Sequence, residues 1–168
     1  MQPYINAIGY SDTNWGELLP FFSKYEWGQY NDNDTSFVFG IVYGLWRVRY
    51  TYFYMRLGKE KIIIENNGTS HSKHTEWKRD KSTGVKIPNK TIITFKNKEY
   101  TVRLSLKLLM HDTMALKISS LLPKPIVSEQ ISEYQGTVEK NGKIIHEFKG
   151  RGFKEWSAKT WKKVPLLF

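Results

Sequence analysis

The residues with the greatest chemical potential lie in a short polar segment near the N-terminus. The segment reads Gly9-Tyr10-Ser11-Asp12-Thr13-Asn14-Trp15-Gly16, and the pair Trp27-Gly28 follows it. A carboxyl group held against an indole in a water-poor pocket has a raised pKa and can deliver a proton. Asp12 beside Trp15 is therefore a candidate acid. The segment equally suits a polar β-turn capped by Asp12 and Asn14 with Trp15 in the core, and both interpretations stay open.

Alternating side chains predict the strands that must position such a site. From Trp46 to Arg56 one parity carries Trp46, Val48, Tyr50, Tyr52 and Tyr54, and the other carries Arg47, Arg49, Thr51, Phe53 and Met55. This period of two is typical of a long half-buried strand. We expect the aromatic parity to face inward and the arginines to face outward. The run from Tyr100 to Met110 repeats the pattern, with apolar side chains at every second position.

Further alternating runs bring the expected number of strands to about ten. The others are Ser23–Gln29, Ser36–Tyr43, Lys61–Glu65, His71–Lys78, Thr91–Lys96, Met114–Ser119, Glu133–Glu139 and Lys143–Phe148. Asn97-Lys98 and Asn141-Gly142 are predicted hairpin turns. Because no helical period is sustained, we expect an all-β antiparallel barrel or sandwich with one brief helix, near residues 16–23 or after Glu155. A closed barrel is favoured, since it removes exposed edges and leaves room for an apolar ligand.

Composition narrows the classes of function. The chain has 168 residues, enough for one domain, and no cysteine, which excludes disulfides, thiol nucleophiles and Cys-ligated metals. His71 and His74 lie three apart on a predicted strand and so face opposite sides, which argues against a metal site. No nucleotide-binding loop or hydrolase motif is present, so no cofactor is expected. With neither a leader sequence nor a transmembrane segment recognisable, we expect a cytoplasmic protein.

Lysine and arginine total 26 against 16 acidic residues, which gives a net charge of +10. This charge permits a nucleic-acid partner, and a basic barrel with aromatic side chains can stack single-stranded bases. Stacking requires cations and aromatic rings on the same exposed face, however, and the alternation in 46–56 places them on opposite faces. Since the lysines are scattered, a solvated basic surface is the favoured interpretation.

Several of these motifs together resemble a known family. The N-terminal segment resembles the signature Gly-Tyr-His-Asp-His-Asn-Trp-Gly of the lipocalin-like superfamily of carotenoid 1,2-hydratases (hydroxyneurosporene synthases), AttH-like proteins and kievitone hydratase. Downstream, Tyr134-Gln135-Gly136-Thr137-Val138, the Asn141-Gly142 turn and Gly150-Arg151-Gly152-Phe153-Lys154-Glu155 are similar in order and spacing to the C-terminal half of that family. The resemblance covers residues 9–155 and implies a single lipocalin-like (calycin) barrel over 1–168, with a tail near 157–168 outside it.

The resemblance also implies a site. Asp12 would donate a proton to an isoprenoid or polyketide double bond, with Tyr10, Asn14 and Trp15 orienting it. The pocket would be lined by Trp15, Trp27, Trp46, Tyr50, Tyr52 and Tyr54, whose π faces stabilise a carbocation. The two histidines of the signature are replaced by Ser11 and Thr13. Family members typically carry two such halves, so a homodimer would supply the second.

Two principal hypotheses of function follow from the missing histidines. The favoured one is a protein that binds a hydrophobic small molecule, isoprenoid or lipid-like, in the barrel cavity. The alternative is a hydratase or cyclase in which Asp12 is the acid. A nucleic-acid-binding barrel is a third and weaker hypothesis.

Overall fold

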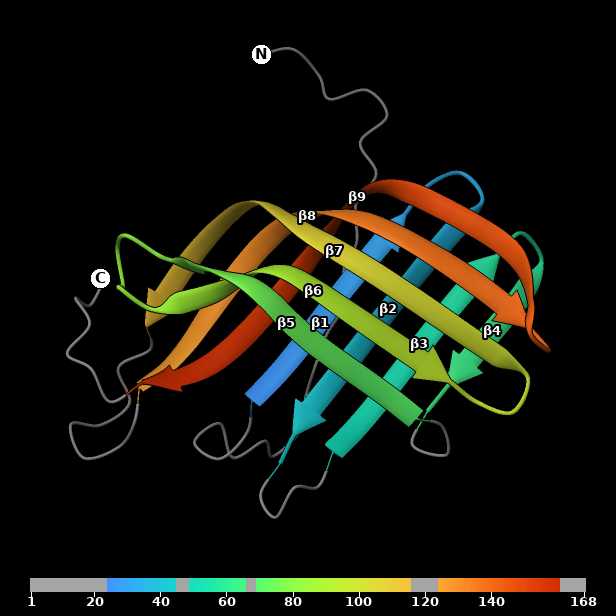
Figure 1. Cartoon of the computed structure of the whole chain (residues 1–168), viewed down its shortest axis with the longest axis horizontal. Coiled ribbons are helices and arrows are strands. Elements are labelled where there is room, and N and C mark those ends of the chain that lie inside the picture. The colour runs from blue at the N-terminus through green and yellow to red at the C-terminus, as the bar shows by residue number, and fades with distance from the viewer. Residues whose placement is uncertain (1–23, 45–48, 66–68, 116–123, 161–168) are drawn as a thin grey trace, which may run out of the picture.

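A computed structural model of the chain describes residues 24–44, 49–65, 69–115 and 124–160, and these form nine β-strands (Figure 1). In chain order the strands are β1 (Lys24–Asn31), β2 (Thr35–Tyr43), β3 (Arg49–Leu57), β4 (Glu60–Ile64), β5 (Thr69–Arg79), β6 (Lys86–Lys96), β7 (Tyr100–Ala115), β8 (Lys124–Lys140) and β9 (Lys143–Thr160). The remaining residues, including Asp12 and its neighbours, lie outside the described part.

The nine strands make one antiparallel sheet in the order β4-β3-β2-β1-β9-β8-β7-β6-β5. The sheet is strongly curled, so β5 and β6 pass across β1, β2 and β3 (Figure 1). Strands β4 and β5 are its two edges and have no backbone ladder between them. A side-chain hydrogen bond of 2.7 Å joins Ser70 of the edge strand β5 to Thr51 of β3, which neighbours β4. The prediction of an all-β antiparallel fold is confirmed, and the sheet forms a half-barrel rather than a closed barrel.

Strand β7 and strand β9 differ from the predicted elements. The run expected at 100–110 and the first two residues of the run expected at 114–119 lie in the single strand β7, which contains a bulge between Leu108 and Met110. Residues 116–119 lie outside the described part. The extra residue of a bulge reverses the side-chain parity beyond it, so Leu108 is buried whereas Met110 is exposed. Strand β9 continues to Thr160. A helix directly after Glu155 is therefore wrong, and the predicted tail at 157–168 begins inside a strand.

Both predicted hairpin turns are confirmed. Asn97 Oδ1 accepts hydrogen bonds from the backbone N–H groups of Glu99 and Tyr100, an arrangement that closes the β6–β7 turn. Asn141 and Gly142 join β8 to β9 with φ values of 50° and 80°. Those positive φ angles are the reason for an Asn-Gly pair at this position.

The expected orientation of β3 is wrong. Tyr50, Tyr52 and Tyr54 are 58%, 38% and 40% exposed, so the tyrosines point outward and do not line the interior. The register explains the reversal, because Phe53 lies opposite Phe39 of β2 and both rings enter the core. On the outer face, Tyr52 lies opposite Gly40 and its ring covers that glycine.

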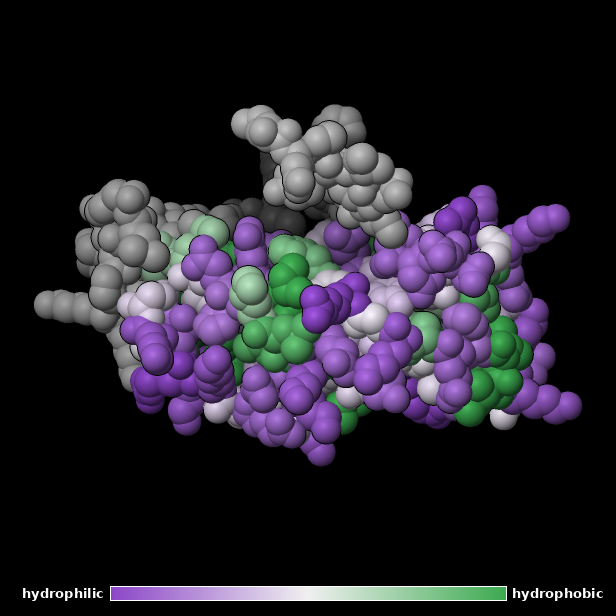
Figure 2. Space-filling model, turned by 90° about the horizontal axis from the view of Figure 1, so that it is seen from above, coloured by the Kyte–Doolittle hydropathy of each residue, from purple (hydrophilic) through white to green (hydrophobic). Residues whose placement is uncertain are grey.

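The outward orientation of these tyrosines also bears on the hypothesis that the protein stacks single-stranded nucleic-acid bases. The outward tyrosines share their face with the exposed Arg56, whereas Arg49 has the inward parity. Parity therefore no longer argues against base stacking on that face. The face seen in Figure 2 is mostly hydrophilic with separate hydrophobic patches. No helix among the described residues is long and apolar enough to cross a membrane.

Aromatic rings fill the interior toward the β3–β4, β6–β7 and β8–β9 turns. The ring centroids of Phe53 and Phe95 are 4.8 Å apart, and those of Tyr30 and Phe148 are 5.0 Å apart. Tyr134 is fully buried among them, and its hydroxyl donates to the carbonyl of Phe153 at 2.6 Å. This end of the half-barrel is a packed aromatic core.

The glycines of the C-terminal motif make that packing possible. A Cβ on Gly136 would lie 2.2 Å from the ring of Phe148. A Cβ on Gly152 would lie 2.5 Å from the carbonyl oxygen of Gln29 on the neighbouring strand and 2.8 Å from the ring of Tyr134. The motif therefore has a packing role, since its glycines leave room for large rings on the inner face.

The substitution Gly152→Ala should destabilise the protein by about 1–3 kcal/mol, because the added methyl group overpacks a core whose nearest atom is backbone. Urea unfolding followed by tryptophan fluorescence measures the change. The neighbouring Arg151 is exposed, so Arg151→Ala is the matched control and should alter stability by less than about 0.5 kcal/mol. Equal effects of the two substitutions would contradict this account of the motif.

Candidate functional site

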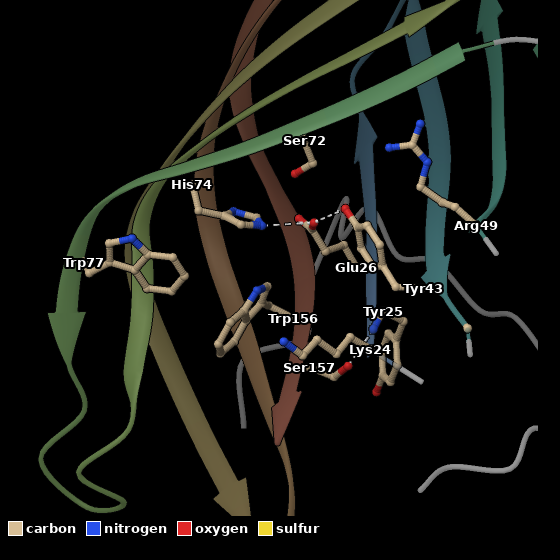
Figure 3. Close-up of a pocket in the computed structure, with 11 residues that line it drawn as sticks. Lys24, Tyr25, Glu26, Tyr43, Arg49, Ser72, His74, Trp77, Trp156 and Ser157 are labelled. Carbon is tan, nitrogen blue, oxygen red and sulfur yellow. Dashed lines mark hydrogen bonds and ion pairs between the residues drawn. The ribbon is translucent and has the colours of Figure 1, made fainter. Parts of the chain in front are cut away.

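A cavity of about 880 Å³ opens at the other end of the curled sheet (Figure 3). Its wall is formed by the first residues of β1, the end of β2, the start of β3, the middle of β5 and the end of β9. These segments are far apart in sequence and meet because the sheet curls. The cavity thus lies where the edge strand β5 faces the first half of the sheet.

The carboxylate of Glu26 lies at the centre of this wall and is only 2% exposed. Its Oε1 atom accepts a hydrogen bond from the Tyr43 hydroxyl at 3.2 Å and contacts Nε2 of His74 at 3.1 Å, as the dashed lines in Figure 3 show. The ammonium of Lys154 lies 3.3 Å from Oε2. A buried charge is tolerated only when it is paired and hydrogen-bonded, and Glu26 meets both conditions.

The hydrogen bonds and the ion pair around Glu26 together form a ring. Lys154 Nζ donates to Thr91 Oγ1 at 2.8 Å, and Thr91 Oγ1 lies 3.3 Å from Nδ1 of His74. Because the hydroxyl of Thr91 accepts from Lys154, its own proton is free to be donated to Nδ1. His74 then carries its proton on Nε2 and donates it to Glu26. This assignment satisfies both nitrogens of His74 and connects β1, β5, β6 and β9.

These contacts set the protonation states. Burial alone would raise the pKa of Glu26, but the hydrogen bond from His74 and the charge of Lys154 outweigh it and lower the pKa to about 2. Burial raises the pKa of Tyr43, and the negative charge of Glu26 raises it further. Burial lowers the pKa of Lys154, and the negative charge of Glu26 partly offsets this effect. At neutral pH the site therefore holds a carboxylate and a neutral phenol, so Glu26 is a fixed negative charge and not a proton donor.

The two oxygens of Glu26 differ in their contacts. Oε1 accepts the hydrogen bonds of Tyr43 and His74, whereas no described group donates a hydrogen bond of normal geometry to the buried Oε2 atom. The contact of Oε2 is the ion pair with the ammonium of Lys154, 3.3 Å away. The hydroxyl of Ser72 lies close enough to lower the pKa of Glu26 and lines the same wall.

Two indoles form the apolar side of the cavity. Trp77 of β5 and Trp156 of β9 meet edge to face with ring centroids 6.0 Å apart, and His74 meets Trp77 in the same manner at 5.8 Å. Trp156 is buried, whereas Trp77 is 48% exposed at the mouth. Figure 3 shows both indoles on one side of the Glu26 network and Arg49 on the other. A flat apolar molecule would find a matching wall here.

The cavity brings together different residues from those predicted. Asp12, Tyr10, Asn14, Trp15 and Trp46 lie outside the described residues. Trp27 has the outward parity of β1 and packs edge to face on Phe153 at 5.7 Å.

The residues that were missed are close neighbours of the predicted ones. Glu26 directly precedes Trp27, and Lys154 lies within the Gly150–Glu155 motif. Each is a charged residue two positions from a motif glycine, and the alternation of the strand points its side chain inward. That pattern could have identified both residues. His74 had no such signal, because its partner lies on a distant strand. The described residues contain no group of three or more His, Cys, Asp or Glu side chains arranged to hold a metal ion.

Comparison with known proteins supports the fold and goes no further. No protein-family model and no curated protein matches the sequence. Among solved structures, kievitone hydratase from Nectria haematococca matches with a TM-score of 0.58 over 88% of this chain, at 14% sequence identity. The two chains share a fold. This chain covers 43% of the kievitone hydratase chain, less than half of its length. The structural likeness agrees with the resemblance predicted from the motifs.

The pairing of Glu26 with Lys154 is open to a thermodynamic test. Lys154→Met should destabilise the protein by about 3–5 kcal/mol, because it leaves the buried carboxylate without its cation. Adding Glu26→Gln to this variant should recover part of that loss, which chemical denaturation of the single and double variants will reveal as a coupling energy. Lys149→Met is the matched control, because Lys149 lies on the same strand as Lys154 but forms a surface ion pair with Glu133 of β8. This substitution should change stability by less than about 1 kcal/mol. Additive effects of the two core substitutions would refute the coupling.

Proposed function

We propose that the chain binds a small molecule with a flat apolar body and a hydrogen-bond donor in the cavity beside Glu26. The observation that carries the proposal is the cavity itself, which is lined on one side by two indoles and in the middle by the ionised Glu26 and its partners. The polar part of this wall suits a ligand that carries a hydroxyl or N–H group.

The remainder of the wall suits the same kind of ligand. A volume of about 880 Å³ lies within the range of small-molecule sites, which are typically apolar with a few placed polar groups. Here Trp77 and Trp156 supply the apolar surface, and Tyr43 and Glu26 supply the polar groups. The fold likeness to a protein named kievitone hydratase is compatible with such a ligand, although a fold alone does not define a function.

Binding in this cavity predicts a specific loss of affinity. The uncharged fluorescent probe N-phenyl-1-naphthylamine should bind the wild-type protein, and Trp77→Ser should weaken that binding roughly fivefold because it removes an aromatic contact. Tyr54→Ser is the matched control, since Tyr54 is 40% exposed but lies on the outer face. Probe fluorescence titrations give both affinities. A larger effect of Tyr54→Ser would move the binding site to the outer face and end the proposal.

Mass spectrometry of organic extracts from the purified protein is the direct route to a natural ligand. A molecule recovered from the wild type should displace the probe and should be depleted in extracts of Trp77→Ser.

A second candidate function is the addition of water to an alkene or the cyclisation of one. The ionised Glu26 beside two indoles supports it, because a carboxylate and π faces together stabilise a carbocation. Since Glu26 is not a proton donor, the acid must be another group, and the family resemblance assigns that role to Asp12. Protonation of an alkene requires a neutral acid in a water-poor site, so the proposal depends on where Asp12 lies.

The enzymatic candidate predicts that the protein adds one molecule of water to an isoprenoid alkene, with geraniol and geranic acid as trial substrates. Asp12→Asn should abolish this turnover, because an amide cannot donate the proton, and should leave binding of N-phenyl-1-naphthylamine intact. Asp34→Asn, at an exposed position, is the control and should retain turnover. Product analysis by mass spectrometry decides the matter, and turnover that survives in Asp12→Asn would remove Asp12 from the mechanism.

A further inference from the structure

We propose that the ligand of this cavity is an organic anion, whose acidic group is held by Arg49. The inference rests on the proposed function and deepens it by naming the class of ligand. The ligand would be a carboxylate, phosphate or similar acid that is attached to the flat apolar body.

The charges of the cavity wall are not balanced. Its lining contains two residues that are cationic at neutral pH, Lys24 and Arg49, and one carboxylate, Glu26. Glu26 is already paired, because the ammonium of Lys154 lies 3.3 Å from it, behind the lining. The two cations at the mouth therefore have no negative counterpart in the wall, and the field in the cavity favours an anion.

Neither cation has an acidic partner elsewhere in the described residues. Within 24–44, 49–65, 69–115 and 124–160, no carboxylate lies within 4.0 Å of Lys24 or Arg49, whereas Lys140 and Lys149 each form ion pairs. An arginine is planar and presents its N–H groups as a fork, which matches the two oxygens of a carboxylate or phosphate. An unpaired arginine at the mouth of an apolar cavity is thus suited to hold an acidic head group.

Arg49 lies on the far side of Tyr43 from Glu26, so an acidic group bound to Arg49 would be kept apart from the carboxylate. Arg49 lies opposite Tyr43 in the β2–β3 ladder, and its charge lowers the otherwise raised pKa of that phenol. The Tyr43 hydroxyl in turn contacts Glu26. Tyr43 therefore stands between the arginine and the carboxylate, and the indoles lie on the far side of Glu26 (Figure 3). A ligand in this cavity would place its acid on Arg49, its donor on Glu26 and its flat body against Trp77 and Trp156.

Two probes that differ only by an acidic group test the inference. 8-Anilinonaphthalene-1-sulfonate is N-phenyl-1-naphthylamine with a sulfonate added, so comparing the two isolates the contribution of the anion. Arg49→Gln should weaken binding of the sulfonate roughly tenfold and that of the uncharged probe less than twofold, because only the former loses a charge-assisted hydrogen bond. Arg49→Lys should give an intermediate loss, since it keeps the charge without the fork. Added salt should weaken the binding of the sulfonate probe and leave the binding of the uncharged probe unchanged.

Arg56→Gln is the matched control. Arg56 is exposed on the same strand as Arg49 but has the outward parity, so the affinity of neither probe should change. If Arg49→Gln leaves sulfonate binding unchanged, or weakens both probes equally, the inference is overturned while cavity binding stands. If the wild type binds neither probe, the proposed function fails as well. A loss confined to the sulfonate and to Arg49 supports the inference.

Discussion

The buried charge of Glu26 is the constraint around which the curled sheet is organised. Moving a carboxylate out of water costs several kcal/mol unless partners surround it, and no single strand provides enough of them. Tyr43 of β2, His74 of β5 and Lys154 of β9 all contact this one side chain, and Thr91 of β6 joins the last two. Because β5 and β6 form one end of the sheet order and β1 and β2 lie in the other half, the network spans the interior. It holds the edge strand over the sheet where no backbone ladder does.

This network divides the interior into two parts with different roles. On one side, rings such as Phe53, Phe95 and Tyr134 are fully buried, and Gly136 and Gly152 leave room for the rings of Phe148 and Tyr134. On the other side, the wall is polar along Glu26 and aromatic along Trp77, and a cavity remains. The glycine motif and the charged pair are therefore complementary, since the first closes one end of the half-barrel and the second keeps a polar surface at the other.

The local features of this fold were predictable, and the long-range ones were not. Alternation and the Asn141-Gly142 turn depend on adjacent residues, so the strands and hairpins followed from the sequence. Alternation does not say which parity faces inward, and in β3 the pairing of Phe53 with Phe39 settled this against the larger tyrosines. The bulge after Leu108 similarly turned the side chain of Met110 outward, and nothing in the alternation of residues 100–110 indicated a bulge. The contact of Glu26 with His74 joins residues 48 positions apart, and only the curl of the sheet brings them together.

The placement of the Glu26 network on a cavity wall argues for a role beyond stability. Replacing a buried ion pair with apolar side chains of similar volume is often neutral or stabilising, so such a pair is weak evidence of a structural need. The network instead lines a cavity, on the same wall as Arg49, for which the described residues supply no carboxylate partner. A carboxylate and an arginine on opposite sides of Tyr43 are complementary to a single molecule that carries both a donor and an acid. This complementarity underlies both the proposed site and the proposed class of ligand.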